Sequence, residues 1–263
     1  MMIKAISAIV LAIVVIAGIL WLPIKIFNII VLLAIVCCFI EYSRMFFDDK
    51  IERFIVTLIG ALVAASGIYI KDHVILCSIL VFSLFVLSVF YMWRTKIMEG
   101  VLNRLGAANF AIIYLALGFS IWTWLRDLPY GREWVLFTIA ASSLCDVFAY
   151  IFGKTIGRHK FAPLVSPNKT VEGFIGALLG SLVGAFIVYY FLLRFVPVQH
   201  IVIMALVIWI LSPLGDLVES MLKRSVGVKD SGSIIPGHGG FLDRLDALAF
   251  IGTFVFVYVK YIL

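Results

Sequence analysis

Charged residues are scarce in this chain of 263 residues. Asp, Glu, Lys and Arg make up 14% of the sequence, whereas hydrophobic residues make up 64% and the mean hydropathy is +1.16. An ordinary soluble domain contains about 25% charged residues. The repeated apolar runs leave no room for a water-soluble core of this length, so the composition indicates an integral membrane protein.

The chain also lacks the cysteine and histidine patterns that are typical of metal centres. All four cysteines fall within apolar runs and none belongs to a C-x-x-C pair, so we interpret them as small apolar packing residues. They are Cys37, Cys38, Cys77 and Cys145. His159 and His238 have no partner at a metal-ligand spacing, and neither is proposed as a zinc ligand.

Long apolar runs dominate what the sequence does contain. Because a helix needs about 17 to 25 mostly apolar residues to cross a bilayer, the sequence predicts an all-α, polytopic membrane protein with about nine transmembrane helices. Trp21, Leu22 and Pro23 follow the first run in place of a small-residue cleavage site, so we interpret that run as a span and not as a secretory signal. The expected spans lie near residues 5–22, 26–41, 54–70, 73–93, 107–125, 132–152, 171–193, 198–218 and 246–262.

Basic residues are distributed unevenly between the two sides of these spans. The larger share of the 21 lysines and arginines falls on the side that contains the loops 153–170 and 219–245. Because basic loops stay in the cytoplasm, the N-terminus is expected inside and the C-terminus outside. Anionic lipid headgroups explain the net charge of +6, so no nucleic-acid partner is expected. The compact length favours a prokaryotic plasma (inner) membrane.

The segment from Ser220 to Asp246, SMLKRSVGVKDSGSIIPGHGGFLDRLD, gathers charge and turn residues between two apolar runs. Asp216 lies near the end of the preceding span, and Asp243 and Asp246 lie at the start of the next. Hard divalent cations prefer oxygen ligands, so these three carboxylates predict a Mg²⁺ site. Alternatively, Asp243 and Asp246 only complement the dipole of the following helix, which leaves Asp216 unexplained.

Between these carboxylates, the run GVKDSGSIIPGHGGF is too rich in Gly and Pro to be helical. Its exposed N–H groups would approach phosphate oxygens closely, and Lys223, Arg224 and Lys229 would supply compensating positive charge. His238 and Arg244 are further candidates for substrate binding in this segment. A glycine-rich loop by itself is more often a turn, but the neighbouring carboxylates and basic residues favour a polyphosphate site.

A second polar segment, Asp146 to Gly176, is expected to face the same side of the membrane. An ionisable group at the centre of a bilayer costs about 2.5 to 3.5 kcal/mol, which favours a functional role for Asp146 over a plain contact between helices. In the run SPNKTVEG, Thr170 is expected to cap the next helix. We interpret this run as a nucleotide contact, although Lys169 alternatively reaches the membrane surface as an interfacial lysine. The candidate residues are Ser166, Asn168, Lys169 and Thr170.

Glycines recur at spacings of three or four residues along one face of the following helix. They are Gly173, Gly176, Gly180 and Gly184. Small residues at this spacing permit close helix packing. The sequence leaves open whether the partner helix belongs to the same chain or to another subunit.

Both polar segments resemble those of the phosphatidate cytidylyltransferases, also called CDP-diacylglycerol synthases. SMLKRSVGVKDSGSIIPGHGGFLDRLD matches that family's signature, and DVFAYIFGKTIGRHKFAPLVSPNKTVEG is similar to its other recurring segment, so the resemblance covers roughly residues 146–246. It implies that CTP and phosphatidic acid give CDP-diacylglycerol and pyrophosphate with Mg²⁺, in phospholipid biosynthesis. It also implies a second, monovalent cation (K⁺), a homodimer, and a polar cavity open to the cytoplasm.

The resemblance also implies roles for individual residues. Asp216 and Asp243 become the main metal ligands, with Asp246 near them. The phosphate-neutralising residues would be Lys223, Arg224 and Lys229, and the residues near the nucleotide Ser166, Asn168, Lys169 and Thr170. The lipid phosphate brings its own nucleophile, so no Ser, Cys or His nucleophile is required. We therefore expect residues 131–263 to form the catalytic region and residues 1–130 to supply transmembrane helices.

Other membrane proteins remain as alternatives. A transporter also places carboxylates within its spans, but it does not require a long basic, glycine-rich loop on one face. Another CTP-dependent lipid phosphotransferase, either a lipid-alcohol kinase or an ether-lipid cytidylyltransferase, is a nearer alternative. The CDP-alcohol phosphotransferases are disfavoured because no Asp in this chain is followed by Gly.

Overall fold

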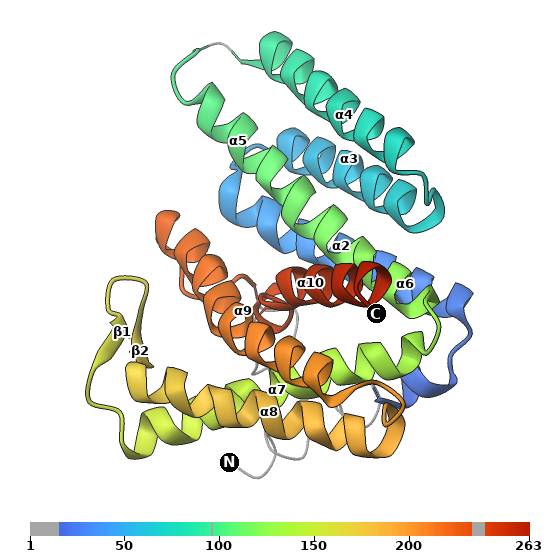
Figure 1. Cartoon of the computed structure of the whole chain (residues 1–263). Coiled ribbons are helices and arrows are strands. Elements are labelled where there is room, and N and C mark those ends of the chain that lie inside the picture. Colours follow the sequence, from blue (N-terminus) through green and yellow to red (C-terminus); the bar gives the residue numbers. More distant parts are fainter. Residues whose placement is uncertain (1–15, 96, 233–239) are drawn as a thin grey trace. The chain divides into compact units, whose positions relative to one another are not determined.

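The computed structural model describes residues 16–95, 97–232 and 240–263, and these residues are mostly helical (Figure 1). The first half contains α2 (Ile24–Phe46), α3 (Lys50–Tyr69), α4 (His73–Arg94), α5 (Val101–Ala111), the π-helical η1 (Ile112–Leu117) and α6 (Gly118–Asp127). The second half contains α7 (Gly131–Thr155), β1 (Lys160–Ala162), β2 (Ser166–Thr170), α8 (Val171–Leu192), α9 (Val198–Ser225), the 3₁₀ helix η2 (Leu242–Arg244) and α10 (Leu248–Tyr261).

Seven helical segments among the described residues are long and apolar enough to cross a membrane. They are α2, α3, α4, the continuous run Val101–Asp127, α7, α8 and α9, and each matches one of the expected spans. At the ninth expected span, α10 has 14 residues, fewer than the roughly 20 that a span needs. The first expected span, 5–22, lies mostly outside the described residues. The chain thus fits a multi-pass membrane protein, while the total of nine spans stays a prediction.

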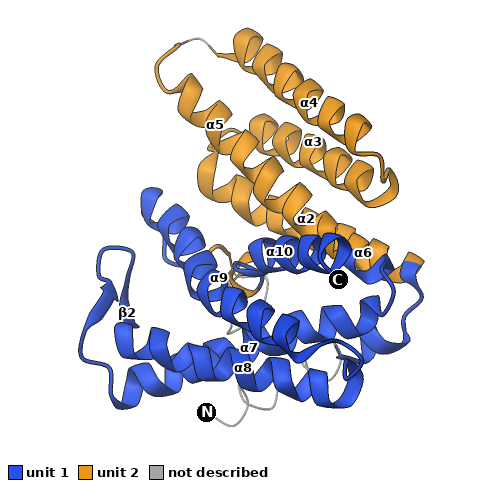
Figure 2. Cartoon of the chain, in the orientation of Figure 1, with its two compact units in different colours: residues 1–24, 125–229, 245–263 blue, residues 25–124, 230–244 orange. Residues whose placement is uncertain are grey.

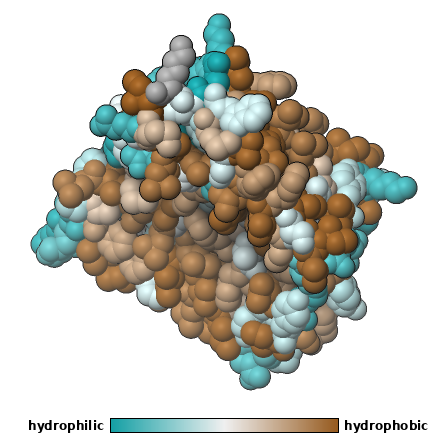
Figure 3. Space-filling view, turned by 90° about the horizontal axis from the view of Figure 1, so that it is seen from above, coloured by the Kyte–Doolittle hydropathy of each residue, from teal (hydrophilic) through white to brown (hydrophobic). Residues whose placement is uncertain are grey.

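Large apolar side chains lie on the surface of these helices. Trp93 is 82% exposed, Phe54 64% and Phe82 66%, and apolar residues cover much of the face shown in Figure 3. A water-soluble monomer rarely exposes apolar patches of this extent. In a bilayer these side chains contact hydrocarbon and not water, so their exposure carries no hydrophobic cost. The outward-facing residues therefore agree with the membrane assignment.

The chain folds into two compact units (Figure 2). Unit 1 contains residues 1–24, 125–229 and 245–263, and unit 2 contains residues 25–124 and 230–244. The described residues of the loop 230–244 therefore belong to the same compact unit as α2 to α5. The expected division at residue 130 concerns function, which packing does not test, so it stays a prediction.

Within unit 2, α3 packs against α4 and against η1. Two buried side chains beyond η1 reach carbonyl groups of α3. Ser120 Oγ donates to the Ala64 carbonyl (3.2 Å), and Trp124 Nε1 donates to the Gly67 carbonyl (2.7 Å). These bonds satisfy polar groups that would otherwise be buried without a partner, and they fix α6 against α3.

Within unit 1, α7 and α8 form the most extensive helix pair, and the glycine face of α8 lies in their interface. A Cβ atom on Gly176 would overlap the ring of Phe152, and one on Gly180 would overlap the Leu144 carbonyl group. The absence of side chains therefore lets the two backbones approach closely. The predicted close packing is confirmed, and the partner helix belongs to the same chain.

A short antiparallel hairpin, β1–β2, connects α7 to α8, with Lys160 opposite Thr170. Thr170 is the N-cap of α8, since its Oγ1 accepts the Gly173 N–H at 3.1 Å, and the predicted cap is confirmed. Glu172 in the first turn accepts the Arg158 N–H (3.0 Å). These contacts fix the hairpin on the N-terminus of α8.

Candidate active site

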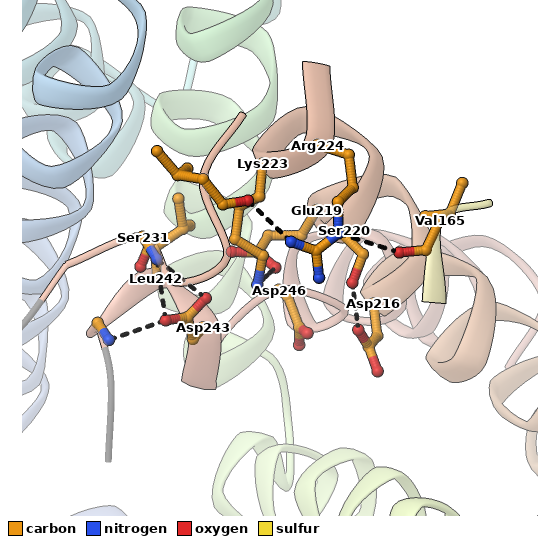
Figure 4. Close-up of polar contacts among 12 residues, drawn as sticks. Val165, Asp216, Glu219, Ser220, Lys223, Arg224, Ser231, Leu242, Asp243 and Asp246 are labelled. Carbon is orange, nitrogen blue, oxygen red and sulfur yellow. Dashed lines mark hydrogen bonds and ion pairs between the residues drawn. The ribbon is translucent and has the colours of Figure 1, made fainter. Parts of the chain in front are cut away.

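The polar face of α9 begins the candidate site. Ser212, Asp216 and Ser220 recur every four residues and therefore share one side of the helix. Ser220 Oγ donates to Asp216 Oδ1 (3.3 Å), as Figure 4 shows. Ser212 Oγ donates to Asp146 Oδ1 of α7 (3.2 Å) and lies 3.0 Å from Ser142 Oγ. A polar network thus joins α7 to α9 around two carboxylates within an apolar helix bundle.

Three carboxylates of unit 1 form a cluster, which we call the carboxylate cluster: Asp146, Asp216 and Asp246. Asp216 acts electrostatically on Asp146 and on Asp246, and Asp146 acts on Asp246. Asp246 lies just before α10, where its Oδ1 accepts the Ala247 N–H (2.7 Å). Asp146 is exposed, the Asp216 side chain is 40% exposed and Asp246 is partly buried, so the cluster is accessible at Asp146 and Asp216. Like charges at this proximity repel, and a cation among them relieves the repulsion.

Lys169, at the end of β2, supplies one cation to the carboxylate cluster. Its Nζ lies 2.8 Å from Asp216 Oδ2 and donates to the Pro213 carbonyl of α9 (2.9 Å). The hairpin thus brings together two residues that the sequence assigned separately, Lys169 to the nucleotide and Asp216 to the metal. Of the other hairpin candidates, Asn168 is exposed and Ser166 is partly buried.

Two residues of the carboxylate cluster, Asp216 and Asp246, were predicted as Mg²⁺ ligands. Across residues 16–95, 97–232 and 240–263, no three Asp, Glu, His or Cys side chains converge closely enough to hold one metal ion. Mg²⁺, however, usually keeps several waters and binds one or two carboxylates together with substrate phosphates. Asp216 and Asp246 fit that smaller donor set. Asp243 belongs to unit 2, so its predicted place beside them is not tested.

The three predicted phosphate-neutralising residues differ in their surroundings. Lys223 is 8% exposed, and its Nζ pairs with the buried carboxylate of Glu219, one helical turn earlier on α9. Arg224 is exposed and donates from Nη1 to the Val228 carbonyl (2.9 Å), which closes the end of α9. Lys229 is exposed. Of the three, Arg224 and Lys229 are therefore the accessible cations.

In unit 2, the described part of the loop 230–244 is organised around Asp243. The Asp243 carboxylate accepts the Ser231 N–H (3.1 Å to Oδ2) and the Gly240 N–H (2.8 Å), as drawn in Figure 4. Arg244 is exposed at the end of η2. His238 lies outside the described residues. Gly240 thus places its bare backbone N–H on a carboxylate of the same loop.

Sequence reasoning missed Glu41, a carboxylate of α2 that binds the same loop. It is 1% exposed and accepts three hydrogen bonds from loop residues. The sequence held a signal for it, because an ionisable residue within an apolar run usually faces a partner. We applied that rule to Asp146 and Asp216 but not to Glu41, which ends the expected span 26–41.

Comparisons with known proteins identify the family of the chain. A model of the "Cytidylyltransferase family" matches residues 2–262. Relatives named phosphatidate cytidylyltransferase are 41% identical in Staphylococcus haemolyticus and 43% identical in Staphylococcus saprophyticus and Staphylococcus aureus. Each of these alignments covers 141 residues, 54% of this chain and 54% of the relative, so the matched chain spans about half the length of these relatives. The family match over residues 2–262 establishes that the chain belongs to the cytidylyltransferase family.

Proposed function

We propose that this protein transfers a cytidylyl group from CTP to phosphatidic acid, giving CDP-diacylglycerol and pyrophosphate in phospholipid biosynthesis. The observation that carries the proposal is the accessible carboxylate cluster of unit 1, with the Lys169 ammonium 2.8 Å from Asp216. A cation-binding group of this kind suits a triphosphate substrate and its metal ion. The family match and the names of the Staphylococcus relatives support the same activity.

The apolar helices suit the pair of substrates. Phosphatidic acid carries two acyl chains and stays in the bilayer, whereas CTP is soluble, so the two meet only at the membrane surface. The carboxylate cluster draws on residues in the C-terminal halves of α7 and α9 and just before α10. We place the cluster at the cytoplasmic face of a plasma membrane, in agreement with the basic loops expected there.

In the proposed reaction, a phosphate oxygen of phosphatidic acid attacks the α-phosphorus of CTP. A new phosphorus–oxygen bond forms, and the bond to the β-phosphate oxygen breaks to release pyrophosphate. The protein has to position the substrates and neutralise the charge of the departing group. Lys169, Arg224 and Lys229 are the basic residues that would do so. Lys223 would contact phosphate only after leaving Glu219.

Asp216 and Asp246 would hold Mg²⁺, and the role of Asp243 as a further ligand rests on the family resemblance. When bound, Mg²⁺ supplies positive charge that stabilises the transferring phosphoryl group and the pyrophosphate. Asp146, on α7, would make the electrostatic potential at these ligands more negative and so favour a bound cation. The proposal includes a K⁺ site, a polar cavity open to the cytoplasm and a homodimer, which rest on the family resemblance and to which we assign no residues.

The experiment that tests this function uses CTP carrying a radioactive label on a known phosphate. Purified protein in detergent receives phosphatidic acid, Mg²⁺ and either α-labelled or γ-labelled CTP. Cytidylyl transfer moves only the α-label into a chloroform-soluble product. Phosphatidic acid has no free hydroxyl group, so a parallel reaction contains a lipid alcohol, and a γ-label in that lipid would identify a lipid-alcohol kinase. No labelled lipid from phosphatidic acid with α-labelled CTP would overturn the proposal.

Two substrate comparisons sharpen the assay. Replacing phosphatidic acid by an ether-lipid phosphate separates an ester-lipid enzyme from an ether-lipid cytidylyltransferase, and we expect the ester lipid to react faster. Replacing CTP by dCTP or ATP measures nucleotide selectivity, and we expect ATP to be rejected. A faster reaction of the ether lipid would transfer the proposal to that substrate.

A further inference from the structure

Glu41 is a buried carboxylate near the C-terminal end of α2, in unit 2. It is 1% exposed. Removing a carboxylate from water is costly unless hydrogen bonds replace its hydration, so a carboxylate at such a position has to be fully partnered. Its partners therefore indicate what the residue does.

Three donors bind Glu41, and all of them come from the loop 230–244. Ser231 Oγ donates to Oε2 (3.0 Å), the Phe241 N–H to Oε1 (2.9 Å), and the Leu242 N–H to Oε2 (2.9 Å). The two backbone groups lie at the start of the 3₁₀ helix η2, and the first N–H groups of a helix have no acceptor within the helix itself. Glu41 thus binds both described ends of the loop with both of its oxygens.

Two glycines of the loop make room for this carboxylate. A Cβ atom on Gly232 would lie 2.5 Å from Glu41 Oε1, and one on Gly240 would lie 2.7 Å from Glu41 Oε2 and overlap Ser231 Oγ. Any side chain at these positions would push the loop away from α2. At Gly232 and Gly240, the glycine is therefore required by the approach of Glu41, in addition to any approach of phosphate considered from the sequence.

The same loop orients Asp243. Ser231 donates its hydroxyl to Glu41 and its backbone N–H to Asp243 (3.1 Å to Oδ2), and Gly240 donates its N–H to Asp243 (2.8 Å). One residue, Ser231, thus joins the buried carboxylate to the proposed metal ligand. Moving Ser231 or Gly240 away from α2 would also remove the donors that set the direction of the Asp243 carboxylate.

We infer that Glu41 is a positioning residue, which holds residues 231 and 240–242 on α2 so that Asp243 is correctly placed for the reaction. This inference rests on the proposed function for the role of Asp243. The hydrogen bonds that carry it lie within unit 2. It assigns a task to the N-terminal half of the chain, which lies outside the two polar segments quoted in the sequence analysis.

A purely structural role is the alternative, and the chain offers a matched control. Glu52 is 3% exposed, lies on the neighbouring helix α3 and accepts the Tyr91 hydroxyl at 2.5 Å. It is a buried carboxylate of the same unit, and its partners among the described residues, Tyr91 and Arg104, lie outside the loop. If Glu41 only stabilised the unit, losing either carboxylate would have the same consequences.

The test compares Glu41→Ala and Glu41→Gln with Glu52→Ala in the full-length protein in detergent. Amide hydrogen exchange of peptides covering residues 230–244 reports on the loop without requiring activity. Cytidylyl transfer is measured as kcat, KM for CTP and the Mg²⁺ concentration for half-maximal rate. For Glu41→Ala we expect roughly tenfold to hundredfold faster exchange at Phe241 and Leu242, and a kcat lower by a similar factor. Glu41→Gln should lie between Glu41→Ala and the unsubstituted protein, because one amide oxygen still accepts.

Glu52→Ala should leave the exchange of the loop unchanged. The inference is overturned if Glu41→Ala keeps the exchange rates and kcat of the unsubstituted protein, or if Glu52→Ala changes the loop equally. If Glu41→Ala does not fold, Ser231→Ala removes a single bond to Glu41 and should change exchange and kcat in the same direction, by a smaller factor. The unsubstituted protein could prove inactive while Glu41→Ala still accelerates hydrogen exchange of the loop. That result would refute the proposed function but keep the inference that Glu41 holds the loop.

Discussion

The Lys169 ammonium lies 2.8 Å from the Asp216 carboxylate, so a strand of the hairpin and the polar face of α9 share one ion pair. The pair is accessible, since the two side chains are 23% and 40% exposed. A divalent cation that binds Asp216 would compete with Lys169 for the same oxygen. Lys169 would then be free to contact a phosphate, which joins its predicted nucleotide role to the metal role of Asp216.

We therefore predict that Lys169→Met lowers kcat/KM for CTP by about a hundredfold, the scale of one lost charge-assisted contact of about 3 kcal/mol. The control is Lys160→Met, which removes an exposed lysine from the other strand of the hairpin. Initial rates at several CTP concentrations give kcat and KM separately. If kcat/KM falls equally in the two variants, the rate depends on the overall positive charge of the hairpin and not on the contact between Lys169 and Asp216.

Neutralising the proposed metal ligands is predicted to stop the reaction. Asp216→Asn and Asp243→Asn each keep the shape of the side chain but remove its charge, so Mg²⁺ binding should fail and the rate should fall by at least about a hundredfold. The matched control is Asp230→Asn, because Asp230 is an exposed carboxylate of the loop 230–244 that contains Asp243. Rates are measured over a Mg²⁺ titration, and removing Mg²⁺ with a chelator should silence the unsubstituted protein as well. Near-normal rates in either variant would remove that residue from the metal site.

The helices were predictable because the length of an apolar run is a local property. The expected span 171–193 became α8 (Val171–Leu192), and the expected span 73–93 became α4 (His73–Arg94). The end of α9 was less predictable. Polar residues end the apolar run near residue 218, but the helix continues to Ser225, since Glu219 and Lys223 pair one turn apart.

The candidate site was predicted as a set of residues but not as a set of contacts. Asp216 and Lys169 were both identified from their residue types, yet their pairing depends on the hairpin, which no periodicity in the sequence indicates. A stripe from Asp216 to Lys223 was expected along α9. The structure divides it into two pairs, Asp216 with Ser220 and Glu219 with Lys223. Glu41 and its loop partners lie 190 to 201 residues apart, so only the tertiary fold could connect them.

The cap of α8 should contribute measurably to stability. Thr170→Ala removes the acceptor of the Gly173 N–H and is predicted to lower the free energy of unfolding by about 1 kcal/mol. Thr155→Ala is the control, because Thr155 Oγ1 donates only to carbonyl groups of its own helix, at an exposed position. Its effect should stay within about 0.5 kcal/mol. Thermal unfolding in detergent, followed by circular dichroism, measures both, and equal midpoints for the two variants would contradict a stabilising cap.

Two helical glycines in different surroundings predict opposite changes in stability on substitution by alanine. A Cβ atom on Gly180 would overlap the backbone of Leu144, so Gly180→Ala should force α7 and α8 apart and cost about 1 to 3 kcal/mol. Gly106 on α5 has no atom within 4 Å of an added Cβ, and Gly106→Ala should stabilise the protein by up to about 1 kcal/mol through better helix propensity.

The two alanine variants differ only in what surrounds the new methyl group, which makes them a direct test of close packing as the reason for glycine. Unfolding midpoints in the same detergent should move in opposite directions. Because the α7–α8 pair also carries Asp146 and the capped start of α8, Gly180→Ala should reduce cytidylyl transfer as well, while Gly106→Ala should not. A Gly180→Ala protein as stable and as active as the unsubstituted chain would show that α8 can shift without disturbing the carboxylate cluster. The tight backbone approach would then have no part in building the site.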